Sequence, residues 1–464
     1  MGSTEPISGP FPSKESLTSF WRTELHELDD HRSTPDLPSS CDVLIIGAGY
    51  AGITSAYHLL ANEETAASPK PSVVLLEARQ ACSGATGRNG GHLRPSVYCR
   101  VSKWMKKYGL EAAEEIAQFE FDHLKAVADL VEKEKIDCDF KLSRSFDIHT
   151  ETEEAAAAKE DYLKLKAAGI AKETIDDVVF YEGKEAEKVS GIKSCVACVE
   201  TSAGQLWPYK LMTSLLAKTV SAGLNLQTYT PATSITPSPT TPGSWIVVTP
   251  RGNITAKKII IATNGYTSAL LPEYATKIYP AKGICCRIVC PPSFTVPKLP
   301  STYVLRLGNG SGDYLIQRDD GSIIVGGARP NYFRDEPSWL GNVDDSTLIP
   351  NAAKYFDTYM QDNFSGWEDS GAYVERIWTG IMGYNSDELP WVGEVPGREG
   401  VYIAAGFEGH GMPVILLATK GVAEMVGRGK KFEDVGVPRM YRATRERLES
   451  KYNVLVNDER VKLP

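Results

Sequence analysis

Two short, uninterrupted apolar runs stand near the start of the chain, at 42–46 and 72–77. Runs of this length without alternation are typical of parallel strands that are buried on both faces. The segment between them, 50–62, instead repeats its apolar residues at helical spacing, as Ile53 and Leu60 illustrate. The pattern therefore predicts a strand–helix–strand unit at the start of an α/β domain.

The rest of the chain alternates between helical and strand-like patterns. Helices are predicted at 102–136, 152–170, 208–222, 344–362 and 412–426. Strands are predicted at 140–149, 225–230, 245–249, 257–262, 284–289, 303–306, 313–318, 322–326 and 401–404. Residues 1–40, rich in Pro, Ser and charge, are expected to form an arm or an edge helix at 17–28 outside the core, and the proline-containing segment 236–243 is expected to be a loop.

The turn after the first strand carries the pattern G-x-G-x-x-G, from Gly47 to Gly52. In a strand–turn–helix context the first glycine permits the tight turn, the second lets the backbone approach a pyrophosphate, and the third lets helix and strand pack closely. Glu77 ends the second strand 25 residues beyond Gly52, near the usual spacing of about 20 for an acid that binds the ribose. The alternative, a glycine-rich turn in an unrelated α/β protein, is disfavoured because all of these features occur together.

Two further small-residue segments favour FAD over NAD as the dinucleotide. The stretch from Ser83 to His92 reads SGATGRNGGH and offers the close backbone approach that a bulky flavin needs. The strand at 258–262 ends in the small, polar turn Thr263, Asn264 and Gly265. A third segment, 401–412, combines a strand, a glycine turn and a helix start.

These motifs resemble the glycine oxidase/D-amino acid oxidase (DAO) family of FAD-dependent oxidoreductases, in particular its γ-glutamylputrescine oxidase-like branch, over residues 42–425. The resemblance implies an α/β, Rossmann-like FAD-binding domain with an inserted α+β substrate domain built on an antiparallel sheet. The expected FAD-binding parts are 41–110, 200–270 and 372–430, the substrate parts are 111–199 and 271–371, and the ends are an arm at 1–40 and an extension at 431–464.

The resemblance also implies a set of cofactor-binding residues. They are Gly47, Ala48, Gly49, Tyr50, Ala51, Gly52, Glu77, Ala78, Arg79, Ser83, Gly84, Ala85, Thr86, Gly87, Arg88, Asn89, Gly90, Gly91, His92, Ala232, Thr263, Asn264, Gly265, Gly406, Gly409, His410, Gly411 and Met412. For His410 the alternatives are a structural role and a flavin contact through its backbone.

The chain departs from the sarcosine oxidase-like relatives at three places. The segment 378–387 contains no Cys to attach FAD, no Lys follows at Met412–Pro413 to hold a substrate carboxylate, and none lies near 323–324 to assist oxygen. We therefore expect noncovalent FAD, although His92 keeps one other covalent route open. An amine substrate is favoured, and a carboxylate would need Arg88, Arg94 or Arg329 as its partner.

Seven side chains are candidates for the substrate pocket: Arg88, His92, Arg94, Tyr314, Arg329, Trp378 and Tyr384. Each has a structural alternative, since a histidine or an aromatic ring serves equally as core packing and an arginine equally as a surface ion pair. An obligatory base is not required, because the flavin takes up the hydride and the protein orients the substrate.

Composition and charge narrow the remaining possibilities. The 464 residues carry 50 Lys and Arg against 59 Asp and Glu, a net charge of −9, which argues against nucleic acid or a membrane surface as the partner. The nine cysteines, including the pair Cys195 and Cys198, form no disulfide framework or metal-ligand pattern, so we expect reduced thiols, no metal and a cytoplasmic location.

The predicted function is oxidation of an amine or amino-acid C–N bond by hydride transfer to FAD, with oxygen as the acceptor. The alternatives are an FAD-dependent dehydrogenase that passes electrons elsewhere and a flavin-fold binding protein that has lost catalysis. The sequence leaves the oligomeric state open.

Overall fold

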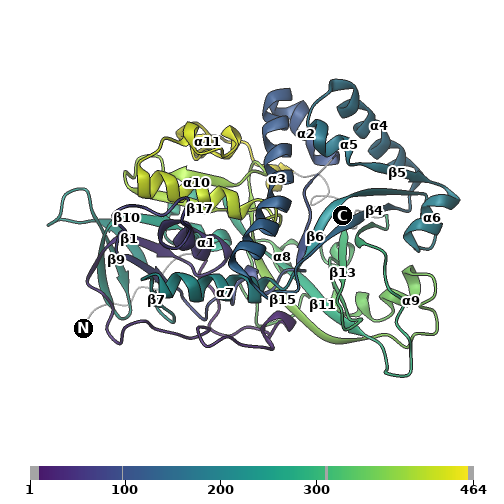
Figure 1. Cartoon of the computed structure of the whole chain (residues 1–464), viewed down its shortest axis with the longest axis horizontal. Helices are drawn as coiled ribbons and strands as arrows, with labels where there is room; N and C mark the ends of the chain where they lie inside the picture. Colours follow the sequence, from purple (N-terminus) through teal and green to yellow (C-terminus); the bar gives the residue numbers. More distant parts are fainter. Residues whose placement is uncertain (1–9, 97, 309–311, 458–464) are drawn as a thin grey trace.

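The computed structural model describes residues 10–96, 98–308 and 312–457. Two β-sheets lie side by side, each with its own covering of helices (Figure 1). The parts of the predicted arm and C-terminal extension at 1–9 and 458–464 lie outside the described residues.

The first sheet has a parallel centre, as the apolar runs predict. Its order is β16 (Trp391–Glu394), β17 (Val401–Ala405), β10 (Gly252–Ile261), β1 (Ser40–Ile46), β2 (Val73–Leu76) and β7 (Asn225–Gln227), with β8 (Ser234–Pro237) and β9 (Trp245–Thr249) adding a hairpin beside β10. Strands β17, β10, β1, β2 and β7 run parallel. Helices α1 (Tyr50–Leu60), α7 (Pro208–Ser221) and α10 (Ile415–Arg428) pack together beside it. The predicted Rossmann-like unit is confirmed.

The second sheet is mainly antiparallel and draws its strands from distant parts of the chain. Its order is β15 (Tyr373–Asn385), β11 (Ile278–Val289), β14 (Ile323–Gly326), β13 (Asp313–Gln317), β12 (Thr302–Arg306), β4 (Lys141–His149), β6 (Ala197–Gln205) and β3 (His92–Leu93), with β5 (Val179–Glu182) beside β6. Only the pairing of β12 with β4 is parallel among these described strands. The domain limits remain a prediction, although β15 in this sheet falls inside the range 372–430 assigned to the FAD-binding domain.

The other helices cover the second sheet and the junction, where the long α3 runs between the two halves (Figure 1). The α-helices are α2 (Cys99–Tyr108), α3 (Leu110–Glu134), α4 (Thr152–Ala168), α5 (Lys172–Asp176), α6 (Lys184–Ser190), α8 (Glu336–Trp339), α9 (Tyr359–Asn363), α11 (Arg445–Glu449) and α12 (Val454–Asn457). The 3₁₀ turns are Phe20–Arg22, Ala85–Gly87, Asn264–Ala269, Pro272–Tyr274, Arg329–Asn331, Ala353–Phe356, Phe432–Asp434 and Arg439–Tyr441.

Several predicted elements were wrong in extent or position. The helix at 102–136 is two helices, because Gly109 adopts φ +87° between α2 and α3. The helix at 344–362 is wrong: proline at 350 interrupts the pattern, and only Ala353–Phe356 and Tyr359–Asn363 are helical. Residues 236 and 237 of the predicted loop belong to β8. Strands β3, β5, β6, β8, β15 and β16 have no counterpart among the predicted strands.

The N-terminal segment also differs from expectation. No helix spans 17–28; only the short turn Phe20–Arg22 forms. Trp21 is completely buried, and its ring packs edge-on against Trp207, 5.6 Å away between centroids. The segment therefore belongs to the core, where two adjacent aromatic residues outweigh the polar composition around them.

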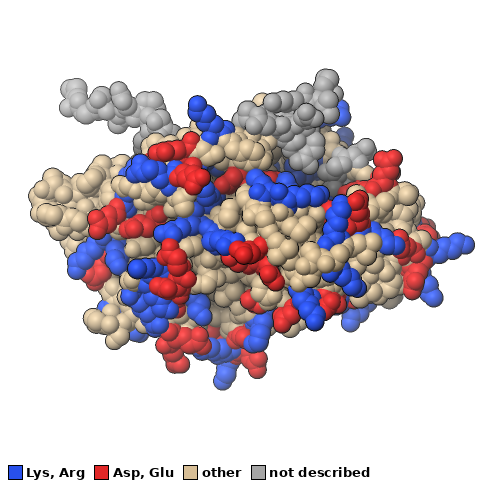
Figure 2. Space-filling model, turned by 90° about the horizontal axis from the view of Figure 1, so that it is seen from above, with Lys and Arg blue, Asp and Glu red and all other residues tan. Residues whose placement is uncertain are grey.

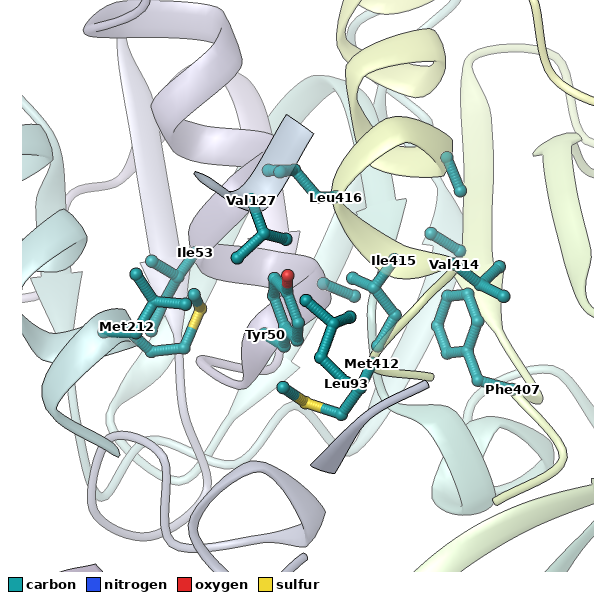
Figure 3. Close-up of a cluster of buried hydrophobic side chains, with 14 of the residues drawn as sticks. Tyr50, Ile53, Leu93, Val127, Met212, Phe407, Met412, Val414, Ile415 and Leu416 are labelled. Atoms are coloured by element: carbon teal, nitrogen blue, oxygen red, sulfur yellow. The ribbon is translucent and has the colours of Figure 1, made fainter. Parts of the chain in front are cut away.

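The core joins the first sheet to the junction. Figure 3 shows the Tyr50 ring at the start of α1 surrounded by Leu93, Val127, Met412 and Ile415, which come from β3, α3 and the turn into α10. This packing fixes the helix N-terminus relative to two loops that enter the site.

The surface mixes charges of both signs, as Figure 2 shows for the described residues on the face seen from above. Among the described helices, none is both long and apolar enough to cross a membrane.

Candidate functional site

A cavity of about 440 Å³ lies between the two sheets. Its wall includes the carboxyl ends of β1, β2 and β10 from the first sheet and residues of β11, β13 and β15 from the second. Ligands of open α/β sheets bind outside the carboxyl ends of the parallel strands, so the position fits a dinucleotide site. The size is typical of small-molecule cavities.

The nucleotide end of the cavity, which we define by 46–51 and 76–79, is shaped by backbone contacts. Gly47 has φ +107°, and a Cβ there would lie 2.7 Å from the carbonyl oxygen of Ala262. A Cβ at Gly52 would lie 1.8 Å from the carbonyl oxygen of Gly47. Both glycines thus bring α1 close to the sheet, and the first amides of a helix have no intrahelical partner and attract anions.

Glu77 ties the glycine turn to the end of β2. Its carboxylate accepts a 2.8 Å hydrogen bond from the Ala48 amide and a 2.9 Å bond from the Arg79 amide. Each carboxylate oxygen keeps a further lone pair, so Glu77 can still accept from ribose hydroxyls.

A buried carboxylate, Asp345, holds the two arginines of this end. Arg79 binds it through two hydrogen bonds of 2.8 and 2.9 Å, and Nε of Arg88 lies 3.4 Å from it. Arg88 also donates to the carbonyl oxygens of Ser83 and Thr379. Burial lowers the pKa of Arg88 to about 10, against the pull of Asp345. Asp345 was missed, because it falls in the segment wrongly predicted as helix.

The N-terminal segment, also missed, closes part of the wall. Phe11 and Pro12 line the cavity. Ser19 donates to the carbonyl oxygen of Gly87, and the Trp21 indole donates to that of Asn89. The aromatic pair at 20–21 is the sequence signal that could have identified this contact.

The opposite end of the cavity carries four polar side chains, His92, Arg94, Tyr314 and His410, which we call the reaction end. His92 Nε2 lies 2.8 Å from the Thr302 hydroxyl, and burial lowers the pKa of His92 to about 3. The hydroxyl of Tyr314 lies 3.0 Å from Sγ of Cys285.

Arg94 belongs to a cluster around the buried Asp147. Its Nη2 lies 3.1 Å from the carboxylate, which also accepts from Arg306 at 2.9 Å and from the Tyr98 hydroxyl at 2.6 Å. Burial opposes the charge on Asp147, but the two guanidinium groups hold its pKa well below the usual range. Two cations therefore share one anion at the cavity wall.

His410 is paired with a second buried carboxylate. Its Nε2 lies 2.9 Å from Oε2 of Glu120 in α3 and 3.1 Å from the Ser96 hydroxyl. Glu120 has 1% of its surface exposed, whereas the His410 side chain is 20% exposed.

Three sequence-predicted candidates are placed away from the cavity wall. Trp378 is completely buried and donates from its indole to the carbonyl oxygen of Arg88 at 2.8 Å. The ring of Tyr384 faces Trp339 at 6.1 Å, and Arg329 lies over the Phe333 ring at 4.3 Å.

Most of the predicted cofactor residues do line the wall. Those among the prediction that do not are Gly52, Ser83, Gly87, Gly91, Gly265 and Gly406. Their glycines serve close packing instead: a Cβ at Gly265 would lie 2.4 Å from the Met382 carbonyl oxygen, and one at Gly406 would lie 2.2 Å from the Asn385 side chain. The wall also includes Tyr266, Ile381, Met382, Phe407 and Ile415, which the sequence does not single out.

Comparison with known proteins gives a family match and several relatives. The model of the family described as "FAD dependent oxidoreductase" (DAO) matches residues 42–425. The chain is 24% identical to the γ-glutamylputrescine oxidoreductase of Escherichia coli K12 over 398 residues, 85% of each chain. It is 26% identical to the glycine oxidase of Geobacillus kaustophilus over 48% of this chain and 54% of that protein.

Solved structures give the same fold. The glycine oxidase from Geobacillus kaustophilus superimposes with a TM-score of 0.69 at 21% identity, over 88% of this chain and 99% of that one. The L-proline dehydrogenase from P. horikoshii gives a TM-score of 0.65 at 19% identity, over 88% and 98%.

The residues present fit FAD. The glycines at 47 and 52 leave the helix N-terminus open to a pyrophosphate, and Glu77 has acceptor capacity for a ribose. At the other end, a Cβ at Gly90 would lie 2.1 Å from the Tyr314 ring, so the loop 83–91 and β13 approach each other closely only because this residue is glycine.

Proposed function

Because the chain belongs to the family of FAD-dependent oxidoreductases, we propose that it oxidises the C–N bond of an amine or amino acid. The single observation that carries the proposal is the continuity of the cavity, which joins a nucleotide end to a reaction end with ionisable and aromatic side chains. The names of two relatives, an oxidoreductase of γ-glutamylputrescine and an oxidase of glycine, support a nitrogen-bearing substrate.

When bound, FAD supplies a hydride acceptor. The chain's own residues position the substrate: Tyr314 offers an aromatic face, and Arg94 offers a cation at the wall. The sequence favours an amine, since no Lys follows His410 at Met412–Pro413. Arg94 nevertheless supports recognition of an acidic group on the substrate, because it shares Asp147 with Arg306 and so is only partly neutralised.

Anaerobic mixing of the flavin-loaded protein with a panel of amines and amino acids tests the proposal. We expect bleaching of the flavin absorbance with at least one nitrogen compound and none with the matching alcohol. Absence of bleaching across the panel, with FAD bound, would favour the lapsed flavin-fold protein. Readmission of air then separates an oxidase, which regains its colour within seconds, from a dehydrogenase, which needs an artificial acceptor.

Two finer expectations accompany this function. FAD is noncovalent, so acid precipitation releases the yellow colour to the supernatant; flavin retained in the pellet would contradict this. A cytoplasmic location, with reduced cysteines, is the expectation from the sequence, and Cys195 and Cys198 are buried and unpaired by disulfides.

A further inference from the structure

The two ring nitrogens of His410 lie in different surroundings. Nε2 faces Glu120 and Ser96, which lie behind the cavity wall. Among the described residues no partner is found for Nδ1, and the residue itself lines the cavity. A histidine held through one ring nitrogen by a carboxylate presents the other to a ligand in a fixed tautomer.

Glu120 is built to hold that tautomer. It is buried, and Oε2 also accepts a 2.7 Å hydrogen bond from the Ser96 amide, which fixes its position. Burial opposes its charge, but His410, Arg100 and the Ser96 amide keep the pKa of Glu120 below its usual value. An ionised Glu120 can only accept hydrogen bonds, so Nε2 carries the proton and Nδ1 carries a lone pair.

Burial favours the neutral form of the His410 imidazole. Burial lowers the pKa of His410, and Glu120 acts in the opposite direction. The other charged or titratable groups that act on the pair are Arg94, Arg100, His92, His123 and Tyr441. A neutral imidazole with a carboxylate behind it accepts a proton readily, because the resulting imidazolium is paired at once.

We propose that His410 is the base that removes a proton from the ammonium form of the substrate, with Glu120 as its positioning residue. This rests on the proposed function. The N–H bond of the ammonium breaks, the proton binds Nδ1, and the electron pair stays on the substrate nitrogen. The neutral amine can then lose a hydride from the neighbouring carbon, for which bound FAD would be the acceptor, and the proton leaves His410 for solvent after the turnover.

The other titratable groups of the reaction end are poorer bases. His92 faces a hydroxyl rather than a carboxylate, and burial lowers its pKa to about 3. Burial raises the pKa of the Cys285 thiol to about 12 and that of Tyr314 far above its usual value, so both remain protonated at neutral pH.

The test is the rate of anaerobic flavin reduction at saturating substrate, measured against pH in the flavin-loaded His410→Asn variant. We expect a loss of about 100-fold or more near pH 7. The deficit should shrink as the pH approaches the pKa of the substrate amine, where the amine binds already neutral. A residue with a merely structural role would show the same deficit at every pH, and that result would overturn the proposal.

A second pair of variants tests Glu120. Glu120→Gln should lower the rate about tenfold near pH 7 and move the acid limb of the profile to lower pH. The Glu120 carboxylate raises the pKa of His410, so its loss lowers that pKa. Glu114→Gln, an exposed carboxylate on the same helix, is the matched control and should leave the profile unchanged. An unmoved limb in Glu120→Gln would contradict the positioning role.

Two further measurements keep the result interpretable. Bound FAD per protein and the melting temperature should match wild type in both variants, and imidazole added to His410→Ala should restore part of the rate. Should the variants bind FAD only in part, the imidazole rescue measured on the flavin-loaded fraction still tests whether His410 acts as the base. Flavin bleaching in the wild-type protein is enough to establish the proposed function. A rate deficit of His410→Asn that does not change with pH would therefore refute only the role of His410 as the base.

Discussion

The two ends of the cavity are built by different means. At the nucleotide end, local backbone geometry does most of the shaping: Gly47, Gly49 and Gly52 lie within one turn, and Glu77 follows at the end of the next strand. At the reaction end, His92, Tyr314 and His410 come from segments more than 90 residues apart. The residues of the nucleotide end are therefore close together in the sequence, whereas those of the reaction end meet only after both sheets have formed.

Both ends contain a buried carboxylate shared by two arginines, yet the pairs differ. Asp345 holds Arg79 and Arg88, and the Arg88 guanidinium is further bound by two backbone carbonyl oxygens. Asp147 holds Arg94 and Arg306, but among the residues that the structure describes the Arg94 guanidinium has no hydrogen-bond partner beyond that carboxylate. We infer that the first cluster is structural and that the second leaves a cation able to meet a ligand.

The largest effect on FAD binding is expected from Gly52→Ala at the nucleotide end. The new Cβ would lie 1.8 Å from the Gly47 carbonyl oxygen, so α1 must move away from β1. We expect loss of FAD binding. We also expect the apoprotein to lose about 3 kcal/mol of stability, which a lower melting temperature would report.

Gly49→Val is the informative partner of that variant. Its backbone at φ −94° suits a side chain, and a Cβ would meet only the Thr86 hydroxyl at 3.1 Å. FAD binding should be lost while the apoprotein keeps its melting temperature, because the side chain occupies the pyrophosphate position. Retained FAD in Gly49→Val would contradict the assignment of this end.

How far the sequence predicts each end follows from the same contrast. The βαβ unit, the glycine turn and Glu77 were predicted because each depends on neighbours in the chain. Asp345 and Glu120 were missed, since nothing local marks a carboxylate that pairs across hundreds of residues. The wall residues Phe11 and Pro12 were missed because the polar composition around them outweighed the one local signal, the aromatic pair at 20–21. Periodicity also failed at 344–362, where the proline at 350 interrupts the helix and Asp345 lies outside it, in ion pairs with distant arginines.

The largest effect on stability, as distinct from FAD binding, should come from Asp345→Asn. This leaves two buried guanidinium groups without their counter-charge, which costs about 3–5 kcal/mol. The melting temperature of the flavin-loaded protein measures it. Asp319→Asn is the control: its salt bridge to Lys141 is exposed and contributes less than about 1 kcal/mol. Equal effects of the two variants would refute the structural role of the Asp345 cluster.

Arg94→Gln should show a smaller effect that depends on the substrate. We expect kcat/KM to fall about 10–100-fold for an N-alkyl amino acid, because a charge-assisted contact is lost. The decarboxylated amine should lose less than about threefold. Steady-state kinetics on the two compounds make the comparison. An equal loss of kcat/KM for both would show that Arg94 does not recognise a carboxylate, and the substrate would then be the amine that the sequence favours.

Tyr314→Phe should give the smallest effect. Compared with Tyr314→Leu, it distinguishes the role of the ring from that of the hydroxyl. The hydroxyl has only the weak thiol partner Cys285 at 3.0 Å, so Tyr314→Phe removes little and should change kcat/KM less than about threefold. The ring is different: it fills the space against Gly90, where a Cβ would lie 2.1 Å from Cε2. Tyr314→Leu should therefore cost at least about tenfold, since it loses the aromatic face that the substrate nitrogen or its alkyl body contacts. Tyr384→Phe serves as the reference, because Tyr384 faces Trp339 outside the cavity wall. A loss in Tyr314→Phe as large as that in Tyr314→Leu would show that the reaction end recognises its substrate through the hydroxyl and not through the ring.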